Sequence, residues 1–188
     1  ASRQVADDTF KQESKTPSLD NAARFLRGLP GKPDFSPFFD PEKRIKAIVV
    51  LGVDQELLAT TNQFFVKTGI ESLKSGIDVL RKITGIQNLM IAVPEHLVQA
   101  AGASGAGVKA VDATYPAAHP ELIVRHILAD EIQNGDISAG ADVAFFSAEA
   151  VSAMGEAYNT GQLPLKKMIT LIQKNGNKRL VSAPIGTP

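Results

Sequence analysis

The chain contains no cysteine and no tryptophan among its 188 residues. Without cysteine, this segment can form no disulfide, can use no thiolate nucleophile and can supply no cysteine ligand to an iron–sulfur cluster. Without tryptophan, no indole ring is available to stack on a ligand. Several kinds of redox centre are therefore excluded from this segment itself.

The sequence also lacks an excess of charge and a long apolar run. Its 20 Lys and Arg residues balance 20 Asp and Glu residues, so the formal net charge is zero. Nucleic-acid-binding proteins usually show a basic excess, and polybasic membrane patches need clustered cations. No apolar run approaches the roughly eighteen residues that span a bilayer, and the N-terminal residues lack a signal-peptide core. We therefore expect no nucleic-acid partner and no transmembrane segment.

The composition that remains is that of a globular domain. Apolar residues make up 44% of the chain and charged residues 21%, close to the averages for soluble domains. The polar stretch 1–17 predicts a flexible lead-in. Residues 18–44 predict a short helix at 18–27 followed by an irregular arm rich in proline and glycine. Residues 45–188 then predict the main domain.

Strand-like and helix-like patterns alternate along residues 45–188. Continuous apolar runs, which are typical of buried parallel strands, occur at Ile45–Gly52, Leu89–Val93, Val108–Val111 and Val143–Phe146. This alternation predicts an α/β fold of three layers, with a mainly parallel, Rossmann-like sheet and right-handed crossovers.

Helices and a final hairpin complete this prediction. Helical spacing of apolar residues, or a proline at a helix start, predicts helices over residues 70–84, 94–101, 119–129 and 148–158. The runs Met168–Gln173 and Arg179–Ala183 flank the turn dipeptide Asn175-Gly176. They predict a C-terminal β-hairpin.

Two acidic residues follow the first predicted strand. In open α/β sheets, ligands bind beyond the carboxyl ends of the strands, so Asp54 and Glu56 are placed where they could hold a ribose or ribityl hydroxyl. The alternative is that both are acids leading into a helix, where negative charge is favourable. Position alone leaves both interpretations open.

Two further motifs predict no site. The glycine-rich run Ala101–Gly107 follows a helix and precedes a strand, the reverse of a phosphate loop, and so predicts a connector. His119 could serve proton or quinone chemistry, but a turn or helix-capping role is the preferred interpretation. His119 and His126 are seven residues apart, two helical turns, which is too far for joint metal ligation. We therefore predict no metal site.

Several stretches resemble two related respiratory subunits. They are the run Gly52–Ala59, the Tyr115-Pro116 turn, the helix Val151–Leu163 and the terminal run Arg179–Pro188. Over about residues 35–188 the chain resembles the C subunit of the Rnf electron-transport complex and the A subunit of the sodium-translocating NADH:quinone oxidoreductase. Gly52, Glu56 and Thr60 match a signature of the first family, and Asp54–Ala59 is similar to the corresponding run of the second.

The resemblance implies a fold of the flavin-subunit type with a cofactor pocket. The residues that it places there are Asp54, Glu56, Asn62, Tyr115 and Ser147. It assigns no catalytic residue.

The cofactor itself is not expected to carry over. The FMN phosphate of a related flavin-binding protein is cradled by a glycine-rich loop, but the corresponding residues 28–35 here do not form that motif. Pro30 and Pro33 also remove backbone N–H donors that a phosphate would need. We therefore expect no cofactor in this segment, with FMN as the alternative. Iron–sulfur clusters are expected only outside it.

The function implied by the resemblance is that of a subunit domain in an ion-coupled electron-transport complex. Such a domain would be soluble and cytoplasmic, peripheral to a bacterial inner membrane, with other subunits as partners and quinone or NADH as candidate ligands. Relatives continue into further domains, so the segment is expected to be part of a longer protein. Two alternatives remain, a genuine FMN- or NADH-binding oxidoreductase domain and a protein-interaction scaffold.

Overall fold

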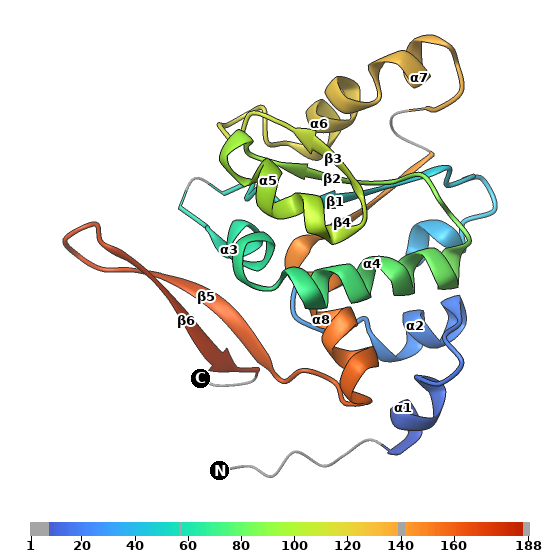
Figure 1. The fold of residues 1–188 in the computed structure, drawn as a ribbon, viewed down its shortest axis with the longest axis horizontal. Coiled ribbons are helices and arrows are strands. Elements are labelled where there is room, and N and C mark those ends of the chain that lie inside the picture. Colours follow the sequence, from blue (N-terminus) through green and yellow to red (C-terminus); the bar gives the residue numbers. More distant parts are fainter. Residues whose placement is uncertain (1–7, 57, 139–141, 186–188) are drawn as a thin grey trace.

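The computed structural model describes residues 8–56, 58–138 and 142–185. They form an α/β domain from which a β-hairpin projects (Figure 1). The central sheet has the order β3-β2-β1-β4, and every neighbouring pair is parallel. Its strands are β1 (Ala47–Leu51), β2 (Leu89–Val93), β3 (Gly107–Ala110) and β4 (Val143–Ser147). The predicted α/β fold with a mainly parallel sheet is confirmed.

Helices cover both faces of this sheet (Figure 1). One face packs against α2 (Leu19–Phe25), α3 (Thr61–Thr68), α4 (Ile70–Thr84) and α8 (Ala148–Thr160). The other packs against α6 (Pro120–Ile127) and lies near α7 (Ala129–Gln133). Short helical turns occur at η1 (Ser36–Phe38), η2 (Glu95–Leu97), α5 (Val98–Ala101) and η3 (Gly102–Ser104).

The residues of β1 alternate between the two faces, as the two-residue period of a strand requires. Ile48 and Val50 belong to the core cluster on the α4 and α8 side, whereas Val49 and Leu51 belong to the cluster on the α6 side. All of β1 is buried. Burial on both faces explains why this strand is a continuous apolar run.

The C-terminal hairpin consists of β5 (Lys166–Ile172) and β6 (Lys178–Pro184), paired antiparallel. The tight turn between them is made by Asn175 and Gly176, and Gly176 has a φ of +81°, which glycine tolerates. The predicted hairpin is therefore confirmed. Gly186-Thr187-Pro188, which contributed to the resemblance, lies outside the described residues.

Helices α3 and α7 are absent from the sequence-based prediction. In α3 the apolar residues Phe64, Phe65 and Val66 are consecutive, and of these Val66 is the one that is buried, so no helical period is visible. The helix predicted over 119–129 ends at Leu128, whose φ of −119° interrupts it, and the chain continues as α7.

Residues 8–44 pack on the same core as the main domain. Helix α1 (Asp8–Glu13) lies within the stretch whose polar composition predicts a flexible lead-in. Its Phe10 is 1% exposed, with its ring 5.9 Å from that of Phe25 and 5.6 Å from that of Tyr158. In the arm, the buried Phe35 ring lies 5.4 Å from Phe146 of β4. Single aromatic anchors attach these segments to the core, and a composition average does not register them.

Helices α4 and α8 touch through their backbones. A Cβ atom at Gly76 would lie 1.9 Å from the carbonyl oxygen of Val151, and one at Gly155 would lie 1.8 Å from the carbonyl oxygen of Ser72. No side chain larger than hydrogen fits at either contact. The two glycines therefore set the distance between the helices.

Adding one methyl group at this contact should destabilise the fold. Gly76→Ala forces α4 and α8 apart, so we expect the free energy of unfolding in urea to fall by about 1–3 kcal/mol, the usual cost of overpacking. Gly102→Ala is the matched control, because a Cβ there meets nothing within 4 Å and φ is −56°. The control should be neutral, or more stable by about 0.4–1 kcal/mol. Equal effects of the two substitutions would contradict the close contact.

Candidate functional site

The candidate site lies where the strand connections diverge. From β1 the chain proceeds outward through β2 to β3, and then crosses back to β4 on the other side of β1. The carboxyl ends of β1 and β4, where Leu51 pairs with Ser147, therefore form the switch point at which open α/β sheets usually bind ligands.

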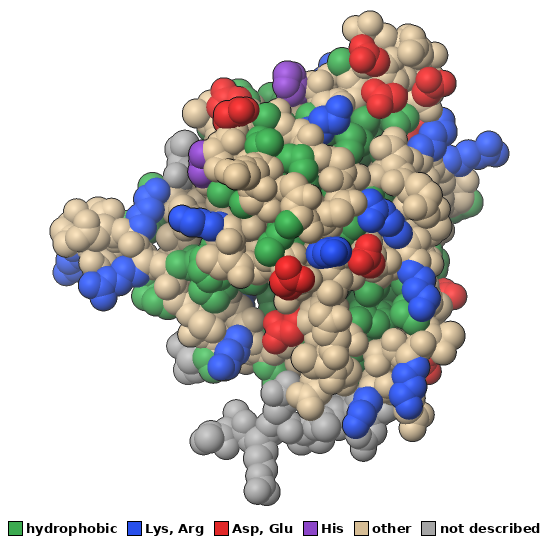
Figure 2. Space-filling view, in the orientation of Figure 1, with side chains coloured by type: hydrophobic (Ala, Val, Ile, Leu, Met, Phe, Trp, Pro, Cys, Tyr) green, Lys and Arg blue, Asp and Glu red, His purple; other side chains and the backbone are tan. Residues whose placement is uncertain are grey.

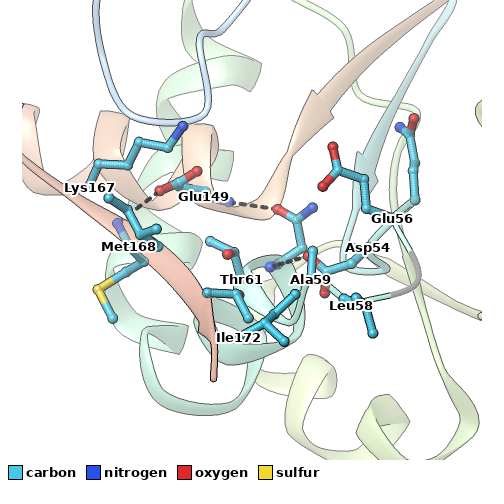
Figure 3. Close-up of a pocket in the computed structure, with 13 residues that line it drawn as sticks. Asp54, Glu56, Leu58, Ala59, Thr61, Glu149, Lys167, Met168 and Ile172 are labelled. Carbon is cyan, nitrogen blue, oxygen red and sulfur yellow. Dashed lines mark hydrogen bonds between the residues drawn. The ribbon is translucent and has the colours of Figure 1, made fainter. Parts of the chain in front are cut away.

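A cavity of about 570 Å³ opens at this edge (Figure 3). Its walls are the loop after β1, the start of α3, the first turn of α8 and strand β5. The lining residues are Asp54, Gln55, Glu56, Leu58, Ala59, Thr61, Asn62, Glu149, Lys167, Met168, Ile169, Thr170 and Ile172. The hairpin thus closes one side of the cavity.

Asp54 caps helix α3. Its side chain is 8% exposed, and its Oδ1 accepts a hydrogen bond from the backbone N–H of Asn62 at 2.9 Å. Its Oδ2 accepts from both the backbone and the side-chain amide of Gln63, each at 3.4 Å. These bonds satisfy donors that a helix N-terminus otherwise leaves free. They agree with the second interpretation of Asp54, in which it is an acid that leads into a helix.

Asn62 joins the loop after β1 to helix α8. Its Nδ2 donates to the carbonyl oxygen of Val53 at 3.1 Å, and its Oδ1 accepts from the backbone N–H of Glu149 at 3.3 Å. One side-chain amide thereby pairs a backbone acceptor of one element with a backbone donor of another.

Ser147 caps helix α8 and faces the arm. Its Oγ accepts from the backbone N–H of Ala150 at 3.1 Å and donates to the carbonyl oxygen of Gly31 at 3.4 Å. Gly31 has a φ of +74°, and a Cβ there would lie 2.5 Å from the nitrogen of Ala150. The arm therefore lies directly over the N-terminus of α8.

Glu149 links α8 to the hairpin. It is 6% exposed, and its Oε1 accepts from the backbone N–H of Met168 at 3.4 Å (Figure 3). Burial raises the pKa of this carboxyl and the negative charge of Asp54 adds to the rise, whereas the Met168 bond and the positive charge of Lys167 oppose it. Sequence reasoning missed this residue. Its position just after a strand, like that of Asp54, was the signal that could have identified it.

The structure brings three of the five predicted site residues together at the cavity, Asp54, Glu56 and Asn62. Glu56 is exposed at the rim. Ser147 lies at the same sheet edge but is turned toward Gly31 and does not line the cavity. Tyr115 is 74% exposed in the turn between β3 and α6 and lies outside the lining as well.

The predicted turn histidine occupies a helix start. His119 is the N-cap residue of α6, although its side chain makes no capping hydrogen bond. His126 lines a separate cavity of about 230 Å³ with Asp112 and Leu122. Over residues 8–56, 58–138 and 142–185, no three His, Cys, Asp or Glu side chains are grouped so that they could hold a metal ion.

Comparison with known families decides between the resemblances. Residues 25–163 match the family described as the NqrA second alpha/beta domain. The chain belongs to the NqrA family. NqrA is the A subunit of the sodium-translocating NADH:quinone reductase, so one of the two resemblances is supported and that to the Rnf C subunit is not. No curated protein matches the chain.

The NqrA match covers the sheet, the arm and helix α8, and stops before β5. It therefore includes Asp54, Asn62 and Glu149 but leaves the hairpin side of the cavity outside. None of the helices in the described part of this NqrA-family chain is long and apolar enough to cross a membrane.

Removing the Asn62 bridge should lower the free energy of unfolding more than removing an exposed amide does. Asn62→Ala leaves the Val53 carbonyl and the Glu149 N–H without their partner, so we expect the free energy of unfolding to fall by about 1–3 kcal/mol. The control is Asn159→Ala, which removes an exposed hydrogen bond to Ser75 and should cost about 0.5 kcal/mol. Denaturant titrations of both variants measure the difference, and equal losses would count against the bridge.

The stability contributed by Glu149 should depend on pH. The folded state raises the pKa of Glu149 above its ordinary value of 4.5, so protonation of this carboxyl stabilises the fold. This stabilisation is complete below pH 4.5 and is lost as the pH rises through the folded pKa. Glu149→Gln keeps an oxygen for Met168 and stays neutral. The stability of the variant relative to wild type should therefore increase as the pH rises above about 4.5.

Chemical denaturation between pH 4 and 8 tests this. Glu156→Gln, on the exposed side of the same helix, controls for the loss of one carboxylate. If the Glu149→Gln difference stays constant with pH, or changes in the opposite direction, the account of Glu149 is wrong.

Proposed function

We propose that this NqrA-family domain is a structural and contact domain within a reductase complex of the sodium-translocating NADH:quinone type, and that hydride transfer takes place elsewhere in the complex. Within such a complex it would lie on the cytoplasmic side, peripheral to the membrane. The observation that carries the proposal is that both helix N-termini at the switch point are capped by protein groups.

A flavin or dinucleotide needs open N–H donors for its phosphate, which in FMN carries close to two negative charges. At the start of α3, the N–H groups of Asn62 and Gln63 already donate to Asp54. At the start of α8, the N–H groups of Glu149 and Ala150 already donate to Asn62 and Ser147. Two of the first-turn N–H donors at each helix start are therefore already used by protein groups.

The charges around the cavity also disfavour an anion. Three carboxylates, those of Asp54, Glu56 and Glu149, line it, against a single cation, Lys167. Losing two or three charge-assisted contacts, at about 1.5–3 kcal/mol each, weakens phosphate binding roughly 10²- to 10⁶-fold. The pocket is therefore a degenerate form of a flavin site. NADH, which carries a pyrophosphate, meets the same obstacle.

A quinone head group is the second candidate for this cavity. It is neutral, with two carbonyl acceptors, and so does not need the occupied N–H donors. The cavity has an apolar wall that includes Leu58, Met168 and Ile172. Beside it, Thr170 Oγ1 is buried and has no hydrogen-bond partner in the described part of the chain. This hydroxyl could donate to a carbonyl oxygen of the ligand.

Calorimetric titration with FMN and riboflavin tests the proposal. Because no phosphate site is available, FMN should show no sub-micromolar binding and no advantage over riboflavin, which has the same ring and ribityl chain without the phosphate. Tight stoichiometric binding of FMN, with riboflavin at least a hundredfold weaker, would show that a phosphate displaces the capping side chains. That result would overturn the proposal.

A further inference from the structure

The hairpin differs in charge from the rest of the chain. All 20 acidic residues lie at or before Glu156, whereas five of the 20 Lys and Arg residues lie after it. These five are Lys166, Lys167, Lys174, Lys178 and Arg179. The net neutrality of the chain thus conceals a basic hairpin attached to an acidic body, and Figure 2 shows Lys and Arg side chains gathered at the projecting tip.

This basic charge is not neutralised within the domain. The ion pairs in the described part of the chain join Lys46 to Asp142 and Arg81 to Asp78, and neither involves the hairpin. Lys167 influences Glu149 at longer range, but Lys174, Lys178 and Arg179 have no carboxylate within ion-pairing distance among the described residues.

The strand ladder separates the hairpin into two faces, since directly paired residues share a face and neighbours alternate. Thr170 pairs with Leu180, and both are half-buried on the face that meets the body of the domain. Ile169 pairs with Val181 on the opposite, outer face, and Lys167 and Ile169 also border the cavity at this edge of the hairpin.

The outer face is apolar along its middle and basic at both ends. Ile169 is 41% exposed and Leu171 is 50% exposed. Lys167 precedes this row at one end, and Arg179, which pairs with Leu171, closes it at the other. The hairpin sheet consists of these two strands. Two strands alone are marginally stable in water, so an apolar face of this kind is typical of a surface that a partner covers.

We propose that the outer face of the hairpin, formed by Lys167, Ile169, Leu171, Arg179 and Val181, docks an acidic protein surface in which carboxylates surround an apolar patch. The proposal rests on the contact role proposed above and names the chemistry of the partner. An anionic lipid surface fits less well, because the tip that would enter it, Gln173–Lys178, carries no apolar side chain.

The test measures binding of the chain to the detergent-solubilised reductase complex prepared without its own NqrA. The double variant Ile169→Ser with Leu171→Ser should bind at least about tenfold more weakly than wild type, because it removes the apolar centre of the interface. Arg179→Glu should also lose about tenfold or more, and wild-type affinity should fall as salt rises.

Matched controls separate this surface from general effects. Leu122→Ser replaces an equally exposed leucine on α6, and Lys82→Glu reverses an exposed charge on α4. Both should bind like wild type. Because all the substituted side chains are exposed, the thermal unfolding of the variants should match that of wild type. Arg179→Glu still tests the surface if the double variant fails to fold.

The outcomes distinguish the two proposals. If wild type binds and the hairpin variants bind equally well, the docking surface is wrong and the contact function stands. If wild type does not bind the complex, the contact function itself is wrong. Binding to vesicles of phosphatidylcholine and phosphatidylglycerol at 3:1 that the hairpin variants abolish would overturn the protein partner in favour of lipid.

Discussion

The backbone contact between α4 and α8 determines where the groups of the candidate site lie. Gly76 and Gly155 allow the two helices to approach until carbonyl oxygens of one helix touch the Cα positions of the other. Helix α8 begins at the carboxyl end of β4, so this contact and the strand together set its direction. Its first turn then presents Ser147 to the arm and Glu149 to the hairpin.

The polar groups at this edge stabilise the domain itself. Asp54 caps α3, Ser147 caps α8, and Asn62 bridges from the loop after β1 to α8. Each bond satisfies a backbone group that would be costly to bury unpaired. An α/β domain can thus keep its switch point while its own polar groups use N–H donors that a cofactor phosphate would require. This explains how the family resemblance extends to the fold while the cofactor is not expected to follow.

The hairpin has a looser connection to the domain than the other elements have. The Met168 N–H bond to Glu149 joins it to α8, and its strands are exposed along most of their length. Its basic charge and apolar outer face are properties of a surface that contacts other proteins. They agree with the proposed role of a contact domain in a larger complex.

The sheet could be predicted from the sequence because its strands are buried on both faces and therefore appear as continuous apolar runs. Helix α3 could not, because its apolar residues Phe64, Phe65 and Val66 are consecutive and because the Asp54 cap comes from seven residues before the helix. The site was predictable in its location, since Asp54 and Asn62 lie where strand order places them. The partners of each side chain were not, because they depend on contacts between residues as distant in sequence as Asn62 and Glu149.

The central claim is that protein groups occupy the N–H donors at the switch point. Hydrogen exchange of the backbone amides of Asn62, Glu149 and Ala150, followed by nuclear magnetic resonance, tests this most directly. We expect all three amides to be protected in the ligand-free protein and to remain unchanged when FMN is added. Rapid exchange in the free protein, slowed by FMN, would show that the donors are open and would contradict the account.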